Sequence, residues 1–132
     1  MDIINIEKLL HKIYGDAFTF HPDFAEEFVK LISKSGKTDA IIKQFLRRLS
    51  TIMQNNNCDY GFPWLEHLKE YDNMYSLHID ADKTNFRILF SRQRSGKLFL
   101  RMFYEKSGKK ATSYDRNVQI ALKRRDSFNQ EV

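Results

Sequence analysis

The sequence predicts an α+β fold in which helices pack on a small antiparallel β-sheet. The first observation is a set of three runs rich in β-forming residues between residues 73 and 110, separated by turn-like clusters at 80–85 and 94–97. This spacing is typical of a β-meander. The second observation is a pair of helices with apolar stripes ahead of these runs, and the third is a basic helix behind them. We expect residues 1–132 to form one domain.

Four elements are expected ahead of the meander. They are a helix at about 2–14, a strand at 17–20, a helix from Pro22 to Ser35 and a helix from about Asp39 to Gln54. Asp2 and Gly15 are suited to cap and to stop the first helix. Lys43, Arg47 and Arg48 lie off the apolar stripe of the last helix, so we expect their side chains in solvent.

The remaining elements are a loop, one helical turn and a final helix. The Asn, Gly and Pro content of residues 55–63 indicates the loop, and residues 64–68 are expected to form a turn of helix. Ser113 is the expected N-cap of the final helix, which runs to about Ser127. Val118, Ala121 and Leu122 are expected to face the sheet, with Arg116, Lys123, Arg124 and Arg125 in solvent. We expect the face of the sheet opposite the helical pair to be open, polar and functional.

Composition excludes several classes of protein. Hydrophobic residues make up 42% of the chain, which is typical of a globular protein. One cysteine rules out a disulfide framework, and no paired Cys or His spacing indicates a metal site or a cofactor. An acidic residue near the N-terminus and the lack of a long apolar run favour a cytoplasmic protein with no membrane partner. The formal net charge of +5 favours a nucleic acid as partner.

The strands of the meander carry basic side chains where a purely structural sheet would carry apolar ones. Strict alternation places Phe86, Ile88 and Phe90 on one face, and Leu98, Leu100, Met102 and Tyr104 on one face of the third run. The remaining positions put Arg87 and His78 on the open face, with Arg101 beside them if the register permits. Between residues 83 and 125 Lys and Arg far outnumber Asp and Glu, so the positive charge belongs to this half of the chain.

These residue types suit the cleavage of RNA. A guanidinium on a rigid strand is a planar donor for phosphate, so Arg87 is the candidate to stabilise a transition state, with Lys106 as a second cation. His78 and Glu105 are candidates for proton transfer. The candidates for RNA binding are Arg101, Lys109 and Lys110 for the backbone and Tyr104 and Tyr114 for stacking on bases. Two other interpretations stay open: Arg87 could pair with acids, and the lysines could belong to a solvated loop.

Short motifs in this order resemble the RelE/ParE superfamily of bacterial toxins, nearest its phage-derived HigB-like branch. The motifs are Gly61-Phe62-Pro63, Leu68-Lys69, Tyr75-Ser76-Leu77-His78, Phe86-Arg87-Ile88-Leu89-Phe90, Leu98 to Phe103, Tyr104-Glu105-Lys106-Ser107 and the helix residue Ala121. The likeness covers residues 17–126, so the helix at 2–14 is additional to the minimal family fold. The resemblance implies a RelE-like fold for the α+β domain.

The resemblance also implies a function. Members with RNase activity are toxins of type II toxin–antitoxin systems that cut mRNA on the ribosome without metal, and a cognate antitoxin masks them. His78 stands where the family usually has arginine, and Glu105 replaces the first lysine of the usual pair. Two alternatives therefore remain. One is a non-enzymatic, ParE-like inhibitor of DNA gyrase or of another protein, and the other is a phage-related protein that kept the fold but lost the chemistry.

Overall fold

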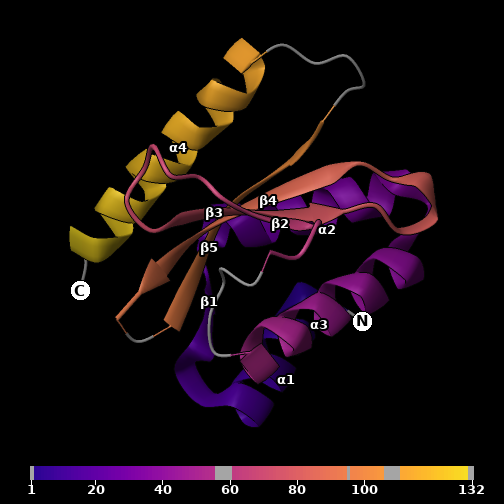
Figure 1. Cartoon of the computed structure of the whole chain (residues 1–132). Coiled ribbons are helices and arrows are strands. Elements are labelled where there is room, and N and C mark those ends of the chain that lie inside the picture. Colours follow the sequence, from indigo (N-terminus) through magenta and orange to yellow (C-terminus); the bar gives the residue numbers. More distant parts are fainter. Residues whose placement is uncertain (1, 56–60, 95, 106–110, 131–132) are drawn as a thin grey trace.

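The fold is α+β, with three helices on one face of a five-stranded sheet and a fourth helix on the other face. The computed structural model describes residues 2–55, 61–94, 96–105 and 111–130. Within these ranges the helices are α1 (Ile3–Tyr14), α2 (Pro22–Ser35), α3 (Thr38–Asn55) and α4 (Ala111–Gln130). Figure 1 shows α4 on the side of the sheet opposite α1, α2 and α3. In the described residues, no helix combines the length and the apolar character needed to cross a membrane.

The helices begin and end close to where the sequence predicts. The Asp2 side chain caps α1 by accepting a hydrogen bond of 2.9 Å from the backbone of Asn5. Gly15 follows α1 with a positive φ of 64°, and Gly36 follows α2 in the left-handed conformation. The prediction of Ser113 as the N-cap of the last helix is wrong, because α4 already begins at Ala111.

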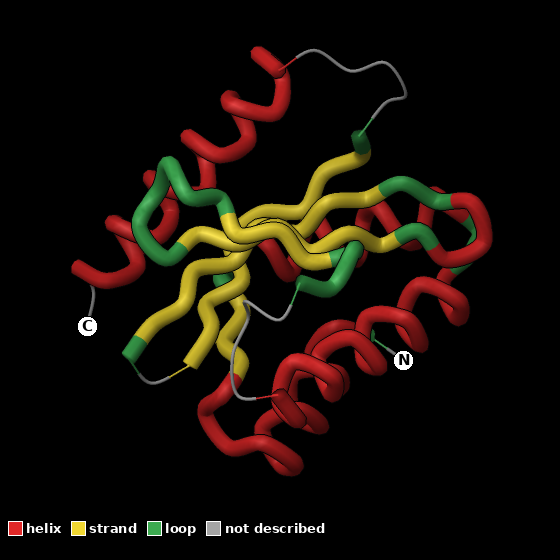
Figure 2. Tube along the Cα trace, viewed as in Figure 1, coloured by secondary structure: helices red, strands yellow, loops and turns green. Residues whose placement is uncertain are grey.

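The sheet contains the predicted meander and two further strands. The strands are β1 (Phe18–Phe20), β2 (Leu65–His67), β3 (Met74–Ile79), β4 (Phe86–Gln93) and β5 (Gly96–Tyr104). Their order is β1-β5-β4-β3-β2, and the tube in Figure 2 shows them as one continuous layer. The sheet is mixed and not purely antiparallel, because β1 pairs with β5 in parallel. The expected helical turn at 64–68 is also wrong: residues 65–67 pair with β3 as a strand.

A β-bulge in β5 changes the faces that strict alternation predicts. Leu89 pairs with Arg101 while its neighbour Phe90 pairs with Phe99, so Leu100 is the extra residue. Leu100 packs on the α4 side together with Leu98, whereas Met102 packs on the side of the N-terminal helices. The prediction of one common face for Leu98, Leu100 and Met102 is therefore wrong. The bulge is what turns both Leu100 and Arg101 toward α4.

Both faces of the sheet are covered by apolar side chains. The larger cluster joins α1, α2 and α3 to the sheet around Phe99, whose ring stacks on Phe90 with the centroids 5.0 Å apart. The buried residues Ile6 and Leu10 show that α1 packs on this core. On the other face, Val118 of α4 packs in a second cluster with the strands. The expectation of an open, polar second face is therefore wrong for the part of that face that α4 covers.

Gly96 lets β5 begin directly beside the turn that precedes β1. Its φ is 153°, and a Cβ atom at this position would lie 2.6 Å from the carbonyl oxygens of Asp16 and Ala17. We expect Gly96→Ala to lower the free energy of unfolding by about 2 kcal/mol, because either the backbone must shift or the β1–β5 pairing must loosen. Urea unfolding would measure it, with Gly36→Ala as the control for the cost of a positive φ alone, since Gly36 has a φ of 71° and a Cβ atom there meets nothing within 4 Å. Equal losses for the two variants would contradict this reading.

Candidate active site

Four polar side chains gather where β3 ends, β4 begins and β5 ends. They are His78, Asn85, Arg87 and Glu105, and we call this cluster the polar end of the sheet. His78 and Arg87 are directly opposite each other in the β3–β4 register. The backbone amide of Glu105 donates a hydrogen bond of 2.9 Å to the carbonyl of Asn85. Three of the predicted catalytic side chains, His78, Arg87 and Glu105, therefore lie together on the α4 side of the sheet.

Arg87 and Glu105 form an ion pair at the polar end. The guanidinium Nε donates to Glu105 Oε1 at 3.1 Å, and the two side chains are 21% and 19% exposed. This partial burial strengthens the pair relative to one in bulk water and fixes the direction of the guanidinium. Because the bond uses Nε, the terminal amino groups of Arg87 are the donors that could bind a phosphate. The geometry thus combines a carboxylate acceptor with a guanidinium whose terminal amino groups could hold an anion.

Asn85 fixes the tautomer of His78. The Asn85 side-chain nitrogen donates to the carbonyl of Glu105, so its oxygen faces His78 Nε2 at 2.7 Å. An amide oxygen only accepts, and Nε2 must therefore carry a proton. In the neutral ring Nδ1 is then the basic nitrogen, and in the charged ring both nitrogens donate. His78 is held in one orientation and can accept or deliver a proton through Nδ1.

Arg48 supports His78 from the opposite side of the sheet. Its guanidinium donates to the backbone carbonyl of His78, pairs with Asp80 at 3.3 Å and lies 5.1 Å from the ring centroid of Trp64. The prediction that Arg48 lies in solvent is wrong, since 15% of its side chain is exposed. Arg48 is a positioning residue for the polar end, and its partners are far away in the sequence.

Tyr114, in the first turns of α4, also approaches the polar end. Its ring packs edge-on against Phe103 with the centroids 5.6 Å apart. Burial raises the pKa of the Tyr114 hydroxyl above its ordinary value. The Ser76 side chain and the charge of Arg87 oppose this shift, whereas the charges of Glu66 and Glu105 add to it. Tyr114 is therefore a neutral hydroxyl near neutral pH, able to donate a hydrogen bond to an anion.

The raised pKa predicts how stability depends on alkaline pH. In the unfolded chain Tyr114 loses its proton near its ordinary pKa of 10.0, whereas in the folded protein it keeps the proton to higher pH. Above about pH 10 the unfolded state is therefore favoured, and the free energy of unfolding falls as pH rises. We expect a smaller fall in Tyr114→Phe, measured by urea unfolding at about pH 9 and about pH 11. An equal fall in both proteins would refute the assignment.

Two other predicted site residues, Arg101 and Tyr104, do not join this cluster. Arg101 faces α4, where its Nε donates to Asn117 at 2.8 Å and a terminal nitrogen donates to Glu27 of α2. Tyr104 lies on the opposite face of the sheet, edge-on to Phe86 with the centroids 5.7 Å apart. Lys106, Lys109 and Lys110 lie outside the described residues.

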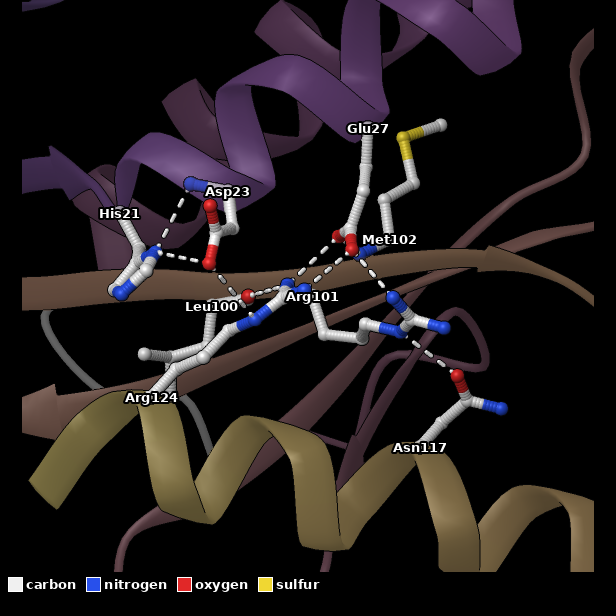
Figure 3. A network of polar contacts seen from close by, with 8 residues as sticks. All are labelled: His21, Asp23, Glu27, Leu100, Arg101, Met102, Asn117 and Arg124. Atoms are coloured by element: carbon white, nitrogen blue, oxygen red, sulfur yellow. Dashed lines mark hydrogen bonds and ion pairs between the residues drawn. The ribbon is translucent and has the colours of Figure 1, made fainter. Parts of the chain in front are cut away.

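Glu27 is the centre of a polar network that the sequence does not reveal (Figure 3). Its carboxylate accepts hydrogen bonds from Arg101, from Arg124 at 2.7 and 2.9 Å, and from the backbone of Met102 at 3.0 Å. Arg124 also donates to the carbonyl of Leu100 at 2.8 Å. The network joins α2, β5 and α4. It also supplies hydrogen-bond partners for the backbone groups of Leu100 and Met102, at the edge of β5 beyond the end of β1.

Two arginines of α4 are therefore not in solvent, as the sequence had suggested. The Arg124 side chain is 17% exposed, and Arg125 is 19% exposed and donates to the carbonyl of Asp72 at 2.7 Å. Glu27 and Asn85 were missed as important residues because their partners are distant in sequence or belong to a turn. No local pattern would have indicated either.

Comparisons of the chain with protein-family models, with curated proteins and with solved structures found no match. Within the part of the chain that the structure describes, no three His, Cys, Asp or Glu residues cluster as they would to hold a metal ion.

Proposed function

We propose that this protein is a RelE-like toxin of a type II toxin–antitoxin system, an endoribonuclease that cuts mRNA on the ribosome. The observation that carries the proposal is the joint placement of Glu105, Arg87 and His78 at the polar end of the sheet. Cleavage through the 2′-hydroxyl of RNA needs a base, a cation for the phosphorane and an acid for the leaving oxygen. These three side chains can supply all three.

The roles follow from the contacts of each group. Glu105 accepts the proton of the 2′-hydroxyl as that oxygen attacks the phosphorus. Arg87 binds the non-bridging oxygens through its terminal amino groups, and the hydroxyl of Tyr114 adds a neutral donor. His78, charged and held through Nε2, delivers the proton on Nδ1 to the departing 5′-oxygen. The bond to the 5′-oxygen breaks as the 2′-oxygen bond forms, which leaves a 2′,3′-cyclic phosphate.

Lys106 is a further cation in this proposal, and it lies outside the described residues. The partners of the proposed toxin are the ribosome with its mRNA and a cognate antitoxin that masks the protein. The overall basic charge of the chain favours association with ribosomal RNA.

A second candidate is a protein of similar architecture that acts by binding alone, on gyrase or on another protein. The ion pair between Arg87 and Glu105 favours it, because the carboxylate neutralises much of the charge that a phosphate would meet. The two candidates differ in whether any covalent bond of RNA is broken.

A reconstituted cleavage assay tests the proposal. Purified protein, first treated with EDTA and then returned to a buffer in which Mg²⁺ is the only divalent cation, is added to end-labelled mRNA with and without programmed ribosomes. We expect cuts on the ribosome that leave a 2′,3′-cyclic phosphate and a 5′-hydroxyl. Intact mRNA under all conditions would favour the binding protein, and cuts that leave a 3′-hydroxyl and a 5′-phosphate would overturn the mechanism.

A further inference from the structure

A basic groove lies at the same end of the sheet as the polar end, but on the opposite face. Its volume is about 550 Å³, and it lies between the C-terminal part of α2 and the short helical turn η2 (Ala81–Lys83). Its lining includes Lys34, Lys37, Asp82, Lys83, Phe86 and Tyr104. We call it the lysine groove. This volume is in the range of small-molecule sites in proteins.

The charge of the groove is positive. Lys37 pairs with Asp82 at 2.9 Å, so one lysine and the one carboxylate of the lining neutralise each other. Lys34 and Lys83 add two further positive charges from two different elements. Among the described residues neither has a carboxylate partner. Two lysines that line one hollow suit an anion such as a phosphate.

The floor of the groove is aromatic. Phe86 is 4% exposed, and it holds the ring of Tyr104 edge-on at 5.7 Å while 54% of Tyr104 remains exposed. A large aromatic ring that is supported on one side and open on the other is a stacking platform for a base. Lysines beside a stacking platform are typical of sites that bind single-stranded nucleic acid.

The turn that carries Lys83 is held in a strained conformation. Asp82 and Lys83 have positive φ values of 52° and 67°, which non-glycine residues rarely adopt. Gln44 of α3 fixes the start of this turn by accepting hydrogen bonds of 2.8 and 3.1 Å from the backbones of Asp80 and Ala81. Lys83 is thus placed beside the groove before any ligand arrives, which lowers the entropy cost of binding.

We propose that the lysine groove binds one nucleotide of a single-stranded RNA, with the base on Tyr104 and the phosphate between Lys34 and Lys83. The inference rests on the proposed function, since it takes RNA as the substrate. Tyr104 and Glu105 are consecutive residues at the end of β5 and face opposite sides of the sheet. An RNA strand that occupies the groove and passes over this end reaches Arg87, so the groove would set which phosphate is cut.

The test is the binding of the full chain to a fluorescent 2′-O-methyl RNA oligonucleotide, whose blocked 2′-oxygen prevents cleavage. Anisotropy titrations at several salt concentrations give the affinity and its salt slope. We expect Tyr104→Ala to weaken binding about tenfold, through the lost stacking. We expect the double variant Lys34→Ala/Lys83→Ala to reduce the slope by about 1.4, about 0.7 for each lysine on a phosphate.

The matched control is Lys30→Ala/Lys43→Ala, which removes the same charge from exposed positions of α2 and α3 outside the groove. It should leave the slope almost unchanged. An equal effect of both double variants, or wild-type binding by the groove variants, would overturn the inference while leaving the proposed function standing. If the wild-type chain neither binds this RNA nor cuts mRNA on ribosomes, the proposed function fails and the inference fails with it.

Discussion

Arg87→Ala should lower the rate of mRNA cleavage by about 10²–10³-fold while the protein stays folded. The expected loss is that of a donor aimed at the charge that develops in the transition state. Arg87 is the only arginine of the polar end in the described residues, and it is held in place by Glu105 at 3.1 Å. Single-turnover cleavage on programmed ribosomes would measure the effect.

Two further variants make the Arg87 result interpretable. Arg87→Lys keeps the charge but loses the planar donor fork, so we expect a smaller loss than in Arg87→Ala. Arg116→Ala removes an arginine from the exposed surface of α4 and should cleave at the wild-type rate. Circular dichroism and a thermal melt establish that each variant is folded. A folded Arg87→Ala protein that cleaves at the wild-type rate would refute the role of Arg87.

Glu27→Ala should lower the free energy of unfolding by about 3 kcal/mol, which is the largest stability effect we expect from a single polar residue. The substitution removes the acceptor of Arg101, Arg124 and the Met102 amide together, and it leaves two partly buried cations without their carboxylate. For a chain of this length the melting temperature should fall by roughly 10 °C. Urea unfolding followed by circular dichroism would measure it.

The control for Glu27 is its neighbour Glu26, which is exposed on the same helix, so that Glu26→Ala should change stability little. A double-mutant cycle between Glu27→Ala and Arg124→Ala should be strongly non-additive, because both belong to one network. Additive effects would show that the carboxylate and the guanidinium act independently, contrary to the geometry in Figure 3.

The sequence was sufficient for those elements that local patterns determine. Helical periodicity and caps such as Asp2 located α1, α2 and α3, and turn clusters separated β3, β4 and β5. β2 was missed because three residues carry too little periodicity, and only pairing with β3 makes them a strand. The bulge at Leu100 was missed because alternation alone cannot show an extra residue.

The candidate site was predicted in part. Arg87 and His78 were placed together correctly because cross-strand neighbours follow from the meander. Arg101 and Tyr104 were both expected to contact RNA, yet Glu27 and Asn117 hold Arg101 beside α4, and Tyr104 lies with Phe86 on the face opposite the polar end. Such long-range pairing depends on where α2 and α4 pack, which no local pattern in the sequence encodes.

The most direct test of the central claim is induced expression without any partner, with growth and transcript 5′ ends followed in the same cells. The proposed function predicts growth arrest together with new 5′ ends inside ribosome-occupied codons, and neither effect with Arg87→Ala. Growth arrest with intact transcripts would contradict it and point to a protein target such as gyrase. Unimpaired growth with intact transcripts would contradict both candidates and indicate a protein that kept the basic face without the chemistry.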